Sequence, residues 1–380
     1  MVPFAGHHMP VQYSSLTLAQ SHQFTRTSAS LFDVSHMVQH RFKGPDAAAF
    51  LEKVTPSSWS TLEPMQSKLT TLLWPGTGGI VDDTVVTRIG VDEYYVVTNG
   101  ACFEKDTKYI DEELGRFGGN VEWKRLDGSG LVALQGPKSA EILSKVLATD
   151  IDLSGIYFGT SFWADLKLGD GSQTHPVLIS RAGYTGEDGF ELSFQGHLYP
   201  ALETTTPAVQ ALLAAGGADG AVKLAGLGAR DSLRLEAGMC LYGHDLDDTT
   251  TPVEGALSWI IPPERRKAGG FHGAEIILPQ LTPKSKGGTG VDRRRVGLVV
   301  EGAPAREGAE IQQDGEKIGV ITSGSPSPTT GKNIAMGYIK DGLHKSGTEV
   351  DVVVRGKKRK GVVTKMPFVP ARLVRKLAQA

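Results

Sequence analysis

An adjacent pair of acids, Asp82 and Asp83, is the first place in the sequence where side chains could do chemistry. The pair follows a Gly-rich turn and precedes a β-branched run that predicts a strand. Successive strand residues point to opposite faces, so one acid would face solvent and the other the interior. A buried carboxylate is costly unless a positive or hydrogen-bonding group meets it. A turn with two solvated acids is an equally weighted alternative.

Two further stretches place charged side chains beside apolar ones. Glu191 lies between Phe190 and Leu192 in a predicted strand, and alternation puts it opposite these neighbours. That favours a solvated acid over one in a pocket. Arg230 and Arg234 are four residues apart on one face of a predicted helix. Paired with nearby acids, they fit a surface ion-pair ladder better than a site.

Motifs for metals and nucleotides are missing. His36 and His40 are four residues apart, but in a strand this spacing spans about 13 Å, too far for one ion. Cys102 and Cys240 form no CxxC pair and are interpreted as small buried residues. A Walker A loop, a dinucleotide fingerprint, HExxH and GxSxG are all absent from the sequence. We therefore predict no metal site.

Composition narrows the class of protein. A chain of 380 residues predicts two or three domains, and its 40% apolar content is enough for a sizeable core. The net charge of -2 argues against a general nucleic-acid binder, and no apolar run approaches the ~20 residues of a membrane helix. Residues 1–25 hold no acidic or basic side chain apart from histidines, so no secretory signal or mitochondrial presequence is visible.

The elements that must position these side chains mix strands and helices without regular βαβ alternation, which predicts an α+β fold. Strands are expected over 69–73, 82–87, 94–99 and 131–135, and between 177 and 194. Helices are expected over 103–117 and about 200–215, the second interrupted or restarted at Pro207. The apolar face of the first helix is expected at Phe103, Thr107, Ile110, Leu114 and Phe117.

The last quarter of the chain differs in composition. A basic, Gly-rich linker at 284–288 leads into short strands split by Gly-containing turns, which predicts a small barrel or sandwich. The basic run at 357–360 is interpreted there as a solvated hairpin turn.

Taken in order, the motifs closely resemble those of the T-protein family of the glycine cleavage system. The matching stretches are SLFDVSHM at 30–37, GGIVDD at 78–83, YVVTN at 95–99, LQGP at 134–137, GYTGEDG at 183–189, ARDSLRLEAG at 229–238, TTPVEG at 250–255 and MPFVP at 366–370. They span nearly the whole chain. The resemblance implies a three-domain, cloverleaf-like folate-binding aminomethyltransferase fold. Two interleaved α+β domains would occupy 1–283, and a β-rich barrel domain 290–380.

The resemblance also implies roles. Asp83 matches the catalytic carboxylate, which would stabilise an iminium-like one-carbon species and hold or accept a folate proton, and Asp82 would be its outward neighbour. Glu191 matches an acid that binds the donor edge of the pterin ring, which replaces its solvated interpretation. Leu373 stands where the family often has a tyrosine, so a hydrogen bond or stacking contact is lost unless Arg372 substitutes for it. The expected folate-binding residues are Met37, Tyr95, Asn99, Tyr184, Glu191, Arg230 and Arg372.

The implied reaction moves a one-carbon unit from an aminomethyl group on the lipoyl arm of H-protein to tetrahydrofolate. The products would be methylenetetrahydrofolate, ammonia and the reduced lipoyl arm. Tetrahydrofolate would be the acceptor substrate and lipoylated H-protein the partner, with no metal, nucleic acid or membrane. From the same resemblance, a monomer in the mitochondrial matrix is expected.

Two alternatives use the same scaffold. A folate-dependent demethylase of a small methylated substrate would turn over without H-protein. A folate-binding module without transferase activity would resemble relatives that carry a Lys-Gly-Cys-Tyr type loop, whereas this chain has RAGY at 181–184 and no cysteine there.

Overall fold

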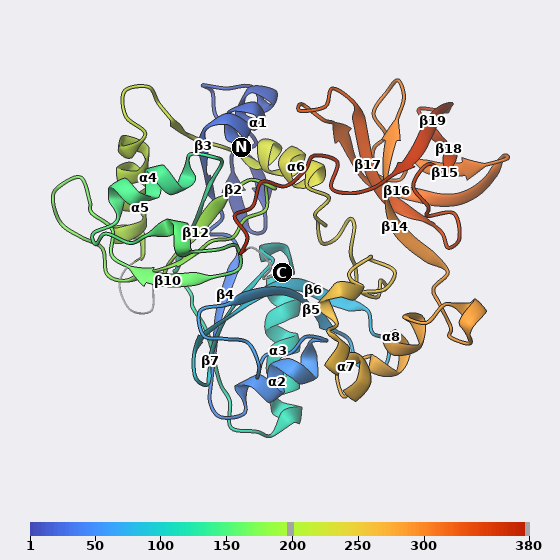
Figure 1. Ribbon diagram of the computed structural model, residues 1–380, viewed down its shortest axis with the longest axis horizontal. Helices are drawn as coiled ribbons and strands as arrows, with labels where there is room; N and C mark the ends of the chain where they lie inside the picture. Colours follow the sequence, from blue (N-terminus) through green and yellow to red (C-terminus); the bar gives the residue numbers. More distant parts are fainter. Residues whose placement is uncertain (196–200, 377–380) are drawn as a thin grey trace.

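Three β-sheet bodies make up most of the computed structural model, which describes residues 1–195 and 201–376 (Figure 1). They are a five-stranded sheet, a six-stranded sheet and a closed barrel, and each has a hydrophobic core of its own. A separate hairpin of β1 (Val2–Phe4) and β2 (His7–Met9) begins the chain. The predicted α+β fold with a β-rich C-terminal barrel is confirmed.

The five-stranded sheet has the order β5-β6-β7-β4-β8, with antiparallel neighbours throughout. Its strands are β4 (Val38–Lys43), β5 (Ser67–Leu73), β6 (Ile80–Gly90), β7 (Glu93–Thr98) and β8 (Glu122–Arg125). Helix α2 (Ala47–Val54) packs on β7, and α3 (Phe103–Phe117), preceded by the 3-10 turn η1 (Gly100–Cys102), packs on β6. β-Branched and aromatic residues fill these strands, which suits a pleated, half-buried surface.

The six-stranded sheet has the order β10-β11-β12-β9-β3-β13. Its strands are β3 (Ala29–Asp33), β9 (Gly130–Gln135), β10 (Ser161–Ala164), β11 (Val177–Ser180), β12 (Gly189–Phe194) and β13 (Val222–Leu224). The helices of this body are α1 (Leu18–Thr27), α4 (Ser139–Val146), η2 (Leu153–Gly155), α5 (Ala201–Ala215) and α6 (Leu227–Glu236).

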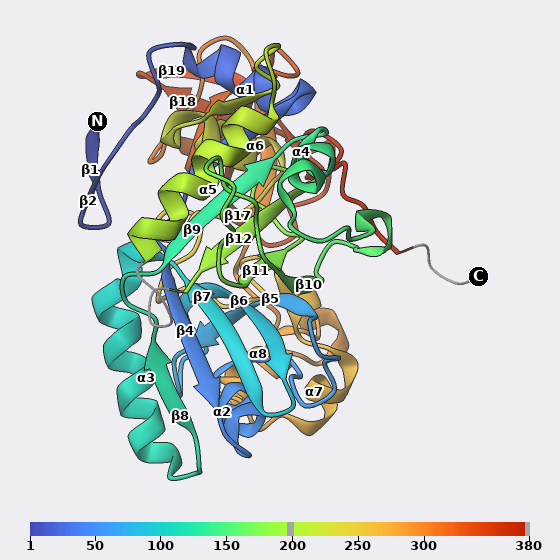
Figure 2. The same ribbon diagram turned by 90° about the vertical axis from the view of Figure 1, so that its left-hand side faces the viewer.

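The two sheets are interleaved in sequence. The chain leaves the six-stranded sheet after β3, builds the five-stranded sheet, and returns as β9 to pair with β3. Figure 2 shows β9 and β12 of one sheet above β4 and β7 of the other. Residues far apart in the sequence, such as those following β7 and those on β12, can therefore meet between the sheets.

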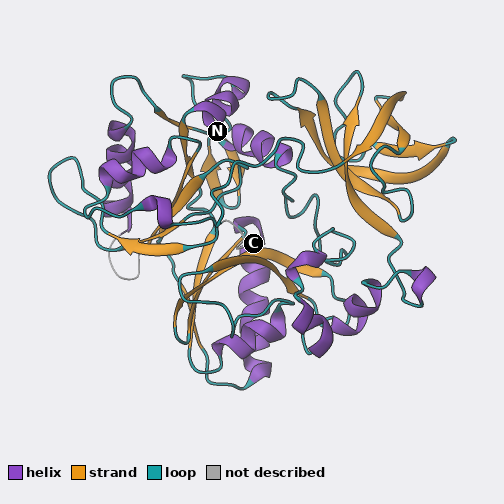
Figure 3. Ribbon diagram, in the orientation of Figure 1, coloured by secondary structure: helices purple, strands orange, loops and turns teal. Residues whose placement is uncertain are grey.

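A short helical segment precedes the barrel. It contains η3 (Ser258–Ile260), α7 (Pro263–Ala268), α8 (Ala274–Gln280) and η4 (Lys284–Lys286). The barrel strands are β14 (Arg293–Val300), β15 (Glu310–Gln313), β16 (Glu316–Pro326), β17 (Asn333–Lys340), β18 (Glu349–Val354) and β19 (Lys357–Thr364). Figure 3 shows this part as strands and loops, with the helices gathered around the two sheets. The barrel strands lie within the predicted 290–380 segment, and the boundaries at 283 and 290 stay predictions.

After the barrel, the chain returns to the six-stranded sheet body, as the dark red trace in Figure 1 shows. The backbone N–H of Phe368 donates to the carbonyl of Glu236 at 2.9 Å, and that of Arg372 donates to Gly186 at 2.8 Å. Among residues 1–195 and 201–376, no helix has the length and apolar character needed to cross a membrane.

Three local predictions are wrong. Helix α5 continues through Pro207, because Ala208 and Leu212 are buried in the core of the six-stranded sheet and this burial outweighs one lost hydrogen bond. The basic run at 357–360 lies in β19, and the turn before it is made by Arg355 and Gly356, both with positive φ.

The third concerns the buried face of α3. The residues that the structure buries there are Asp106, Tyr109, Ile110 and Glu113, whereas Phe103 is 40% exposed. Phe103 therefore lies outside the core, whereas Ile110, Leu114 and Phe117 of the predicted stripe do pack in or against the core of the five-stranded sheet. An acid, Asp106, points inward instead.

Candidate active site

The pair Asp82–Asp83 lies on β6, between β5 and β7. Asp82 is 0% exposed and Asp83 is half-buried. The two side chains point to opposite faces, but the prediction that Asp82 is the outward neighbour is wrong. Helix α3 covers the face to which Asp82 points and brings Asp106 against it. Both acids are therefore held within the fold, and the alternative of two solvated acids in a turn is wrong as well.

Asn99 connects the two acids. It follows β7 directly, and its backbone N–H donates to Asp82 Oδ2 at 2.8 Å. Its side-chain Nδ2 lies 2.9 Å from Asp82 Oδ1, 3.0 Å from Asp83 Oδ1 and 3.1 Å from the Asp83 carbonyl oxygen. One amide therefore orients the carboxylate of Asp83 relative to that of Asp82.

This environment changes the ionisation of Asp83. Burial, and then the charge of Asp82, raise the pKa of Asp83 to about 7, although the hydrogen bond from Asn99 acts to lower it. A carboxyl with a pKa near neutrality can exchange a proton under physiological conditions, which an ordinary aspartate does poorly.

Three more predicted residues gather around Asp83. The Arg230 guanidinium on α6 lies 4.6 Å from the ring centroid of Tyr184, a cation–π contact. Burial lowers the pKa of Arg230, while the charges of Glu191 and Asp83 act to raise it, so both acids lie within electrostatic reach. Burial raises the pKa of Glu191, and Arg230 acts to lower it. Asp83 from β6 and Glu191 from β12 thus lie near Arg230 from α6.

Two predictions about these residues are corrected. Glu191 is half-buried near Arg230, so the solvated interpretation is wrong. The surface ladder is wrong too: Arg234 does pair with Asp231 at 2.8 Å, but it is 2% exposed and also donates to Asp245 Oδ2 at 2.7 Å and to Ser323 Oγ at 2.9 Å. Arg234 therefore connects α6 to the barrel, and Arg230 is the arginine of α6 that lies near Asp83 and Glu191.

Met37 and Tyr95 lie at different depths. Met37 is half-buried and, like Val97 of β7, packs against a core cluster that contains Ala229 of α6. Tyr95 is 4% exposed, and its hydroxyl donates to Gln39 Oε1 at 2.8 Å. The ring of Tyr95 is thus enclosed by protein, and its hydrogen bond to Gln39 holds it in place.

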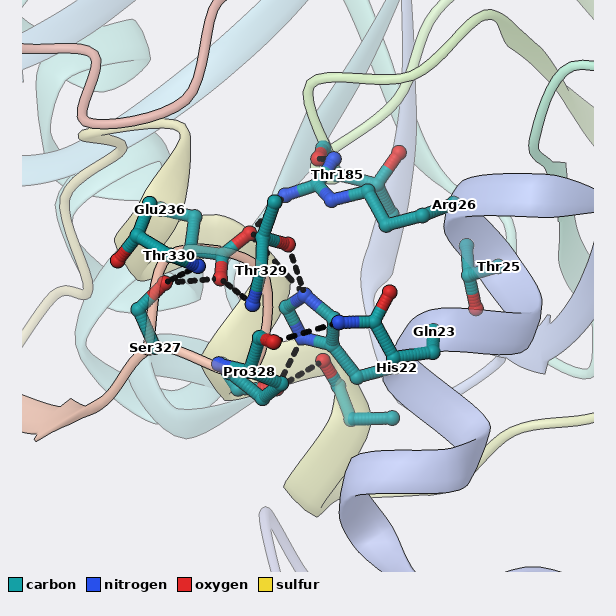
Figure 4. A network of polar contacts seen from close by, with 12 residues as sticks. His22, Gln23, Thr25, Arg26, Thr185, Glu236, Ser327, Pro328, Thr329 and Thr330 are labelled. Atoms are coloured by element: carbon teal, nitrogen blue, oxygen red, sulfur yellow. Dashed lines mark hydrogen bonds and ion pairs between the residues drawn. The ribbon is translucent and has the colours of Figure 1, made fainter. Parts of the chain in front are cut away.

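Arg372 lies apart from Asp83. Its guanidinium donates to the carbonyl of Arg26 at 3.2 Å and lies 3.8 Å from Glu187 Oε1, with 59% of its side chain exposed. It borders a second polar network, centred on Glu236, that joins α1, α6 and the barrel (Figure 4). The structure does not bring Arg372 to the residues around Asp83.

Two further buried residues, Asp106 and Cys102, lie beside Asp82. Asp82, Cys102 and Asp106 offer ligand-type atoms within 4.8 Å of one another, the group of described residues that could hold a metal ion. Sequence reasoning missed Asp106. The available signal was its position four residues before Ile110, which puts it on the same helical face as a core residue.

A surface groove of about 640 Å³ lies elsewhere, over α3 and β8, with Phe103, Trp123 and Arg125 in its wall. The residues around Asp83 do not line it. The groove lies on the outer side of α3 and is therefore separate from Asp83, Glu191 and Arg230.

The fold closely matches a solved structure. The crystal structure of glycine cleavage system aminomethyltransferase T from Bartonella henselae aligns with a TM-score of 0.85 at 35% sequence identity, covering 98% of this chain and 95% of that one. The architecture is therefore that of a one-carbon group transferase of the aminomethyltransferase class.

Sequence comparison narrows the class. The GCVT N-terminal domain model matches residues 1–265, and the glycine cleavage T-protein C-terminal barrel domain model matches 293–370. The probable mitochondrial aminomethyltransferase of Schizosaccharomyces pombe is 48% identical over 369 residues, covering 97% of this chain and 89% of that protein. The mitochondrial aminomethyltransferase of Saccharomyces cerevisiae is 43% identical over 384 residues, covering 97% and 91%. The chain belongs to the glycine cleavage T-protein family, as the motifs predicted, and is an enzyme of that family.

Proposed function

We propose that this enzyme transfers the methylene carbon of an aminomethyl group on the lipoyl arm of H-protein to tetrahydrofolate. The products are 5,10-methylenetetrahydrofolate, ammonia and dihydrolipoyl H-protein. The observation that supports the proposal most directly is the setting of Asp83, a half-buried acid with a pKa of about 7, held by Asn99 within electrostatic reach of Arg230.

The chemistry accounts for an acid of this kind. The carbon–sulfur bond to the lipoyl arm breaks as a folate nitrogen bonds to the carbon, and the carbon becomes iminium-like when its amine leaves as ammonia. A preplaced carboxylate stabilises this positive charge without reorganising. Asp83 can also accept the proton that the attacking folate amine must lose. The second folate nitrogen then closes the five-membered ring.

Recognition of folate is assigned to the surrounding side chains. The pterin ring presents an amino group and a ring N–H along one edge, and the Glu191 carboxylate can accept both. Arg230 suits a carbonyl or carboxylate of the ligand. Tyr184 and Met37 are suited to pack on flat rings. Tyr95, being enclosed, supports this wall from below, and Arg372 is proposed only for the outer end of the ligand.

We expect Glu191→Gln to weaken tetrahydrofolate binding by about ten- to a hundredfold, because it removes charge-assisted hydrogen bonds worth ~1.5–3 kcal/mol. The glutamine amide would also turn a donor toward the donor edge of the ring. Titration calorimetry with tetrahydrofolate measures the change. The matched control is Glu301→Gln on the barrel surface, which should bind as the parent does. Unchanged affinity of Glu191→Gln would remove this residue from the site.

The pH dependence follows from Asp83. Because the ionised form is needed and its pKa is about 7, kcat/KM should rise with pH through about 7 and level off above it. An ordinary aspartate would give a flat profile in this range, since it is ionised well below pH 6. Initial rates at subsaturating folate between about pH 5.5 and about pH 8.5 distinguish the two.

Partners and location are proposed on the same basis. The relatives that match this chain are named mitochondrial, which supports the mitochondrial matrix as its location. We propose a monomer that needs no metal and engages lipoylated H-protein. Turnover that requires H-protein supports this reading, whereas turnover of a small methylated donor alone would favour the demethylase alternative.

A further inference from the structure

Two acids share a fully buried position beneath the candidate active site. Asp82 on β6 and Asp106 on α3 are both 0% exposed, and their carboxyl oxygens lie within 4.8 Å of each other and of the Cys102 sulfur. Asn99 donates to both oxygens of Asp82, at 2.8 and 2.9 Å. No group among the described residues lies in good hydrogen-bond geometry with either oxygen of Asp106, although the side chains of Thr98 and Asp82 are near enough to act on its pKa. Asp106 is therefore the less well hydrogen-bonded of the two acids.

Two ionised carboxylates would be costly in this position. Like charges this close disfavour ionisation of one partner, and a buried charge without a donor is expensive. A single proton on Asp106 removes both costs. Its hydroxyl can donate to Asp82, and the remaining charge stays on the carboxylate that Asn99 already serves.

We propose that Asp82 and Asp106 share one proton and act together as a positioning unit for Asp83. Asp106 holds the proton and Asp82 holds the charge, so Asn99 is fixed by two hydrogen bonds to one anion. Asn99 Nδ2 also donates to Asp83 Oδ1 at 3.0 Å. The orientation of Asp83 thus depends, through Asn99, on a pair of acids that touch no substrate.

The groups on α3 agree with this distribution of charge. Burial, and then Asp82, raise the pKa of Asp106 to about 10, while Lys105 acts to lower it. Burial also raises the pKa of the Cys102 thiol, so no second anion forms beside the pair. Tyr109, whose pKa burial likewise raises, stays neutral.

The titratable groups near the pair that lie outside α3 include Asp82 itself, Tyr242 and Asp83. Burial raises the pKa of Asp82, and the hydrogen bond with Asp106 and then those from Asn99 act to lower it, which marks Asp82 as the partner better able to carry the charge. Tyr242 faces the pair from the loop after α6 and stays neutral, because burial raises its pKa. Asp83 lies on the opposite face of β6, and burial, and then the charge on Asp82, raise its pKa. Asp248 lies further out, where it accepts a hydrogen bond from Tyr242 and forms an ion pair with Lys105.

Infrared spectroscopy tests the shared proton without relying on the proposed function. At about pH 8.5, above the pKa of Asp83, the parent protein should retain a carboxylic-acid C=O stretching band. Asp106→Asn should abolish that band, and circular dichroism should show an unchanged fold because the amide is isosteric and can donate to Asp82. Absence of the band in the parent protein overturns the proposal whether or not the variant folds.

The pH profile of activity tests the positioning role, and this arm rests on the proposed function. Asp82→Asn removes the charge beside Asp83 and should shift the acid limb of kcat/KM downward by on the order of one pH unit. Asp106→Asn replaces one neutral group by another and should leave the position of that limb where it is. A downward shift of similar size in both variants would mean that Asp106 is ionised, and the proposal would fail.

A cation between Asp82, Cys102 and Asp106 would satisfy the same oxygens. Elemental analysis of the purified protein separates the two cases. Stoichiometric zinc or another divalent metal, together with no carboxylic-acid band, would overturn the shared proton. No bound metal together with the band supports it.

Discussion

The variant Asp83→Asn is expected to lose about 10²–10⁴-fold in the rate of methylenetetrahydrofolate formation from aminomethyl-loaded H-protein. Asparagine keeps the shape and the contact with Asn99, but it cannot accept a proton and carries no charge to stabilise an iminium-like carbon. Because the acid lies half-buried rather than in water, solvent does not readily replace it.

Two measurements make this result specific. Calorimetry with tetrahydrofolate should give binding similar to the parent, so that the loss falls on kcat. Asp111→Asn, an exposed acid on the outer side of α3, is the matched control and should turn over at the parental rate. An Asp83→Asn rate within about threefold of the parent would remove the acid from the mechanism.

The sequence was sufficient to predict that adjacent acids on a strand separate to opposite faces. It could not indicate which face is covered, because that depends on α3, which packs on β6 from about twenty residues further along the chain. The same limit explains Asp106. An acid on the inner face of a helix contradicts the apolar pattern, and only the partner across the interface, Asp82, makes its position intelligible.

The arginines of α6 show the limit in another way. Their spacing predicts one helical face, and a surface ladder is what such a pattern usually means. Arg234 instead donates to Asp245, in the loop after α6, and to Ser323 on β16 of the barrel, while Arg230 lies over the ring of Tyr184. The spacing of charges along the helix favoured a surface position for Arg230, which is wrong. The family motifs, in contrast, placed Arg230 in a pocket.

The overall architecture was better determined by the sequence. Short strands of β-branched residues separated by glycine turns predict the barrel, which the structure confirms as a closed sheet of β14 to β19. Pro207 was misjudged because helix propensity carries no account of the core that α5 covers.

The largest expected effect on stability comes from Glu236, at the end of α6. Its carboxylate is 0% exposed and accepts hydrogen bonds from Arg26 at 2.7 Å and His22 at 3.0 Å on α1 (Figure 4). Ser327 and Thr329, in the loop after β16, donate to the same carboxylate. One buried acid thus joins the barrel to the six-stranded sheet body.

Glu236→Gln should lower the free energy of unfolding by about 3–5 kcal/mol, because it leaves Arg26 facing a neutral amide and turns a donor toward other donors. Urea unfolding followed by circular dichroism measures the shift in midpoint. Glu141→Gln removes a solvent-exposed ion pair with Lys145 and should leave the midpoint in place. A Glu236→Gln midpoint equal to that of Glu141→Gln would show that the network contributes little.

The pH dependence of this difference separates charge from packing. Burial acts to raise the pKa of Glu236, but the hydrogen bonds from His22 and Ser327 and the charge of His22 hold it at about 2, below the ordinary 4.5. A carboxyl whose folded pKa is lowered stabilises the protein above its unfolded pKa and loses that contribution as pH falls toward the folded value. The gap between parent and Glu236→Gln should therefore narrow between about pH 6 and about pH 3. A gap that stays constant would indicate that the glutamine disrupts packing, and that loss of the buried charge between the barrel and the six-stranded sheet body is not the cause.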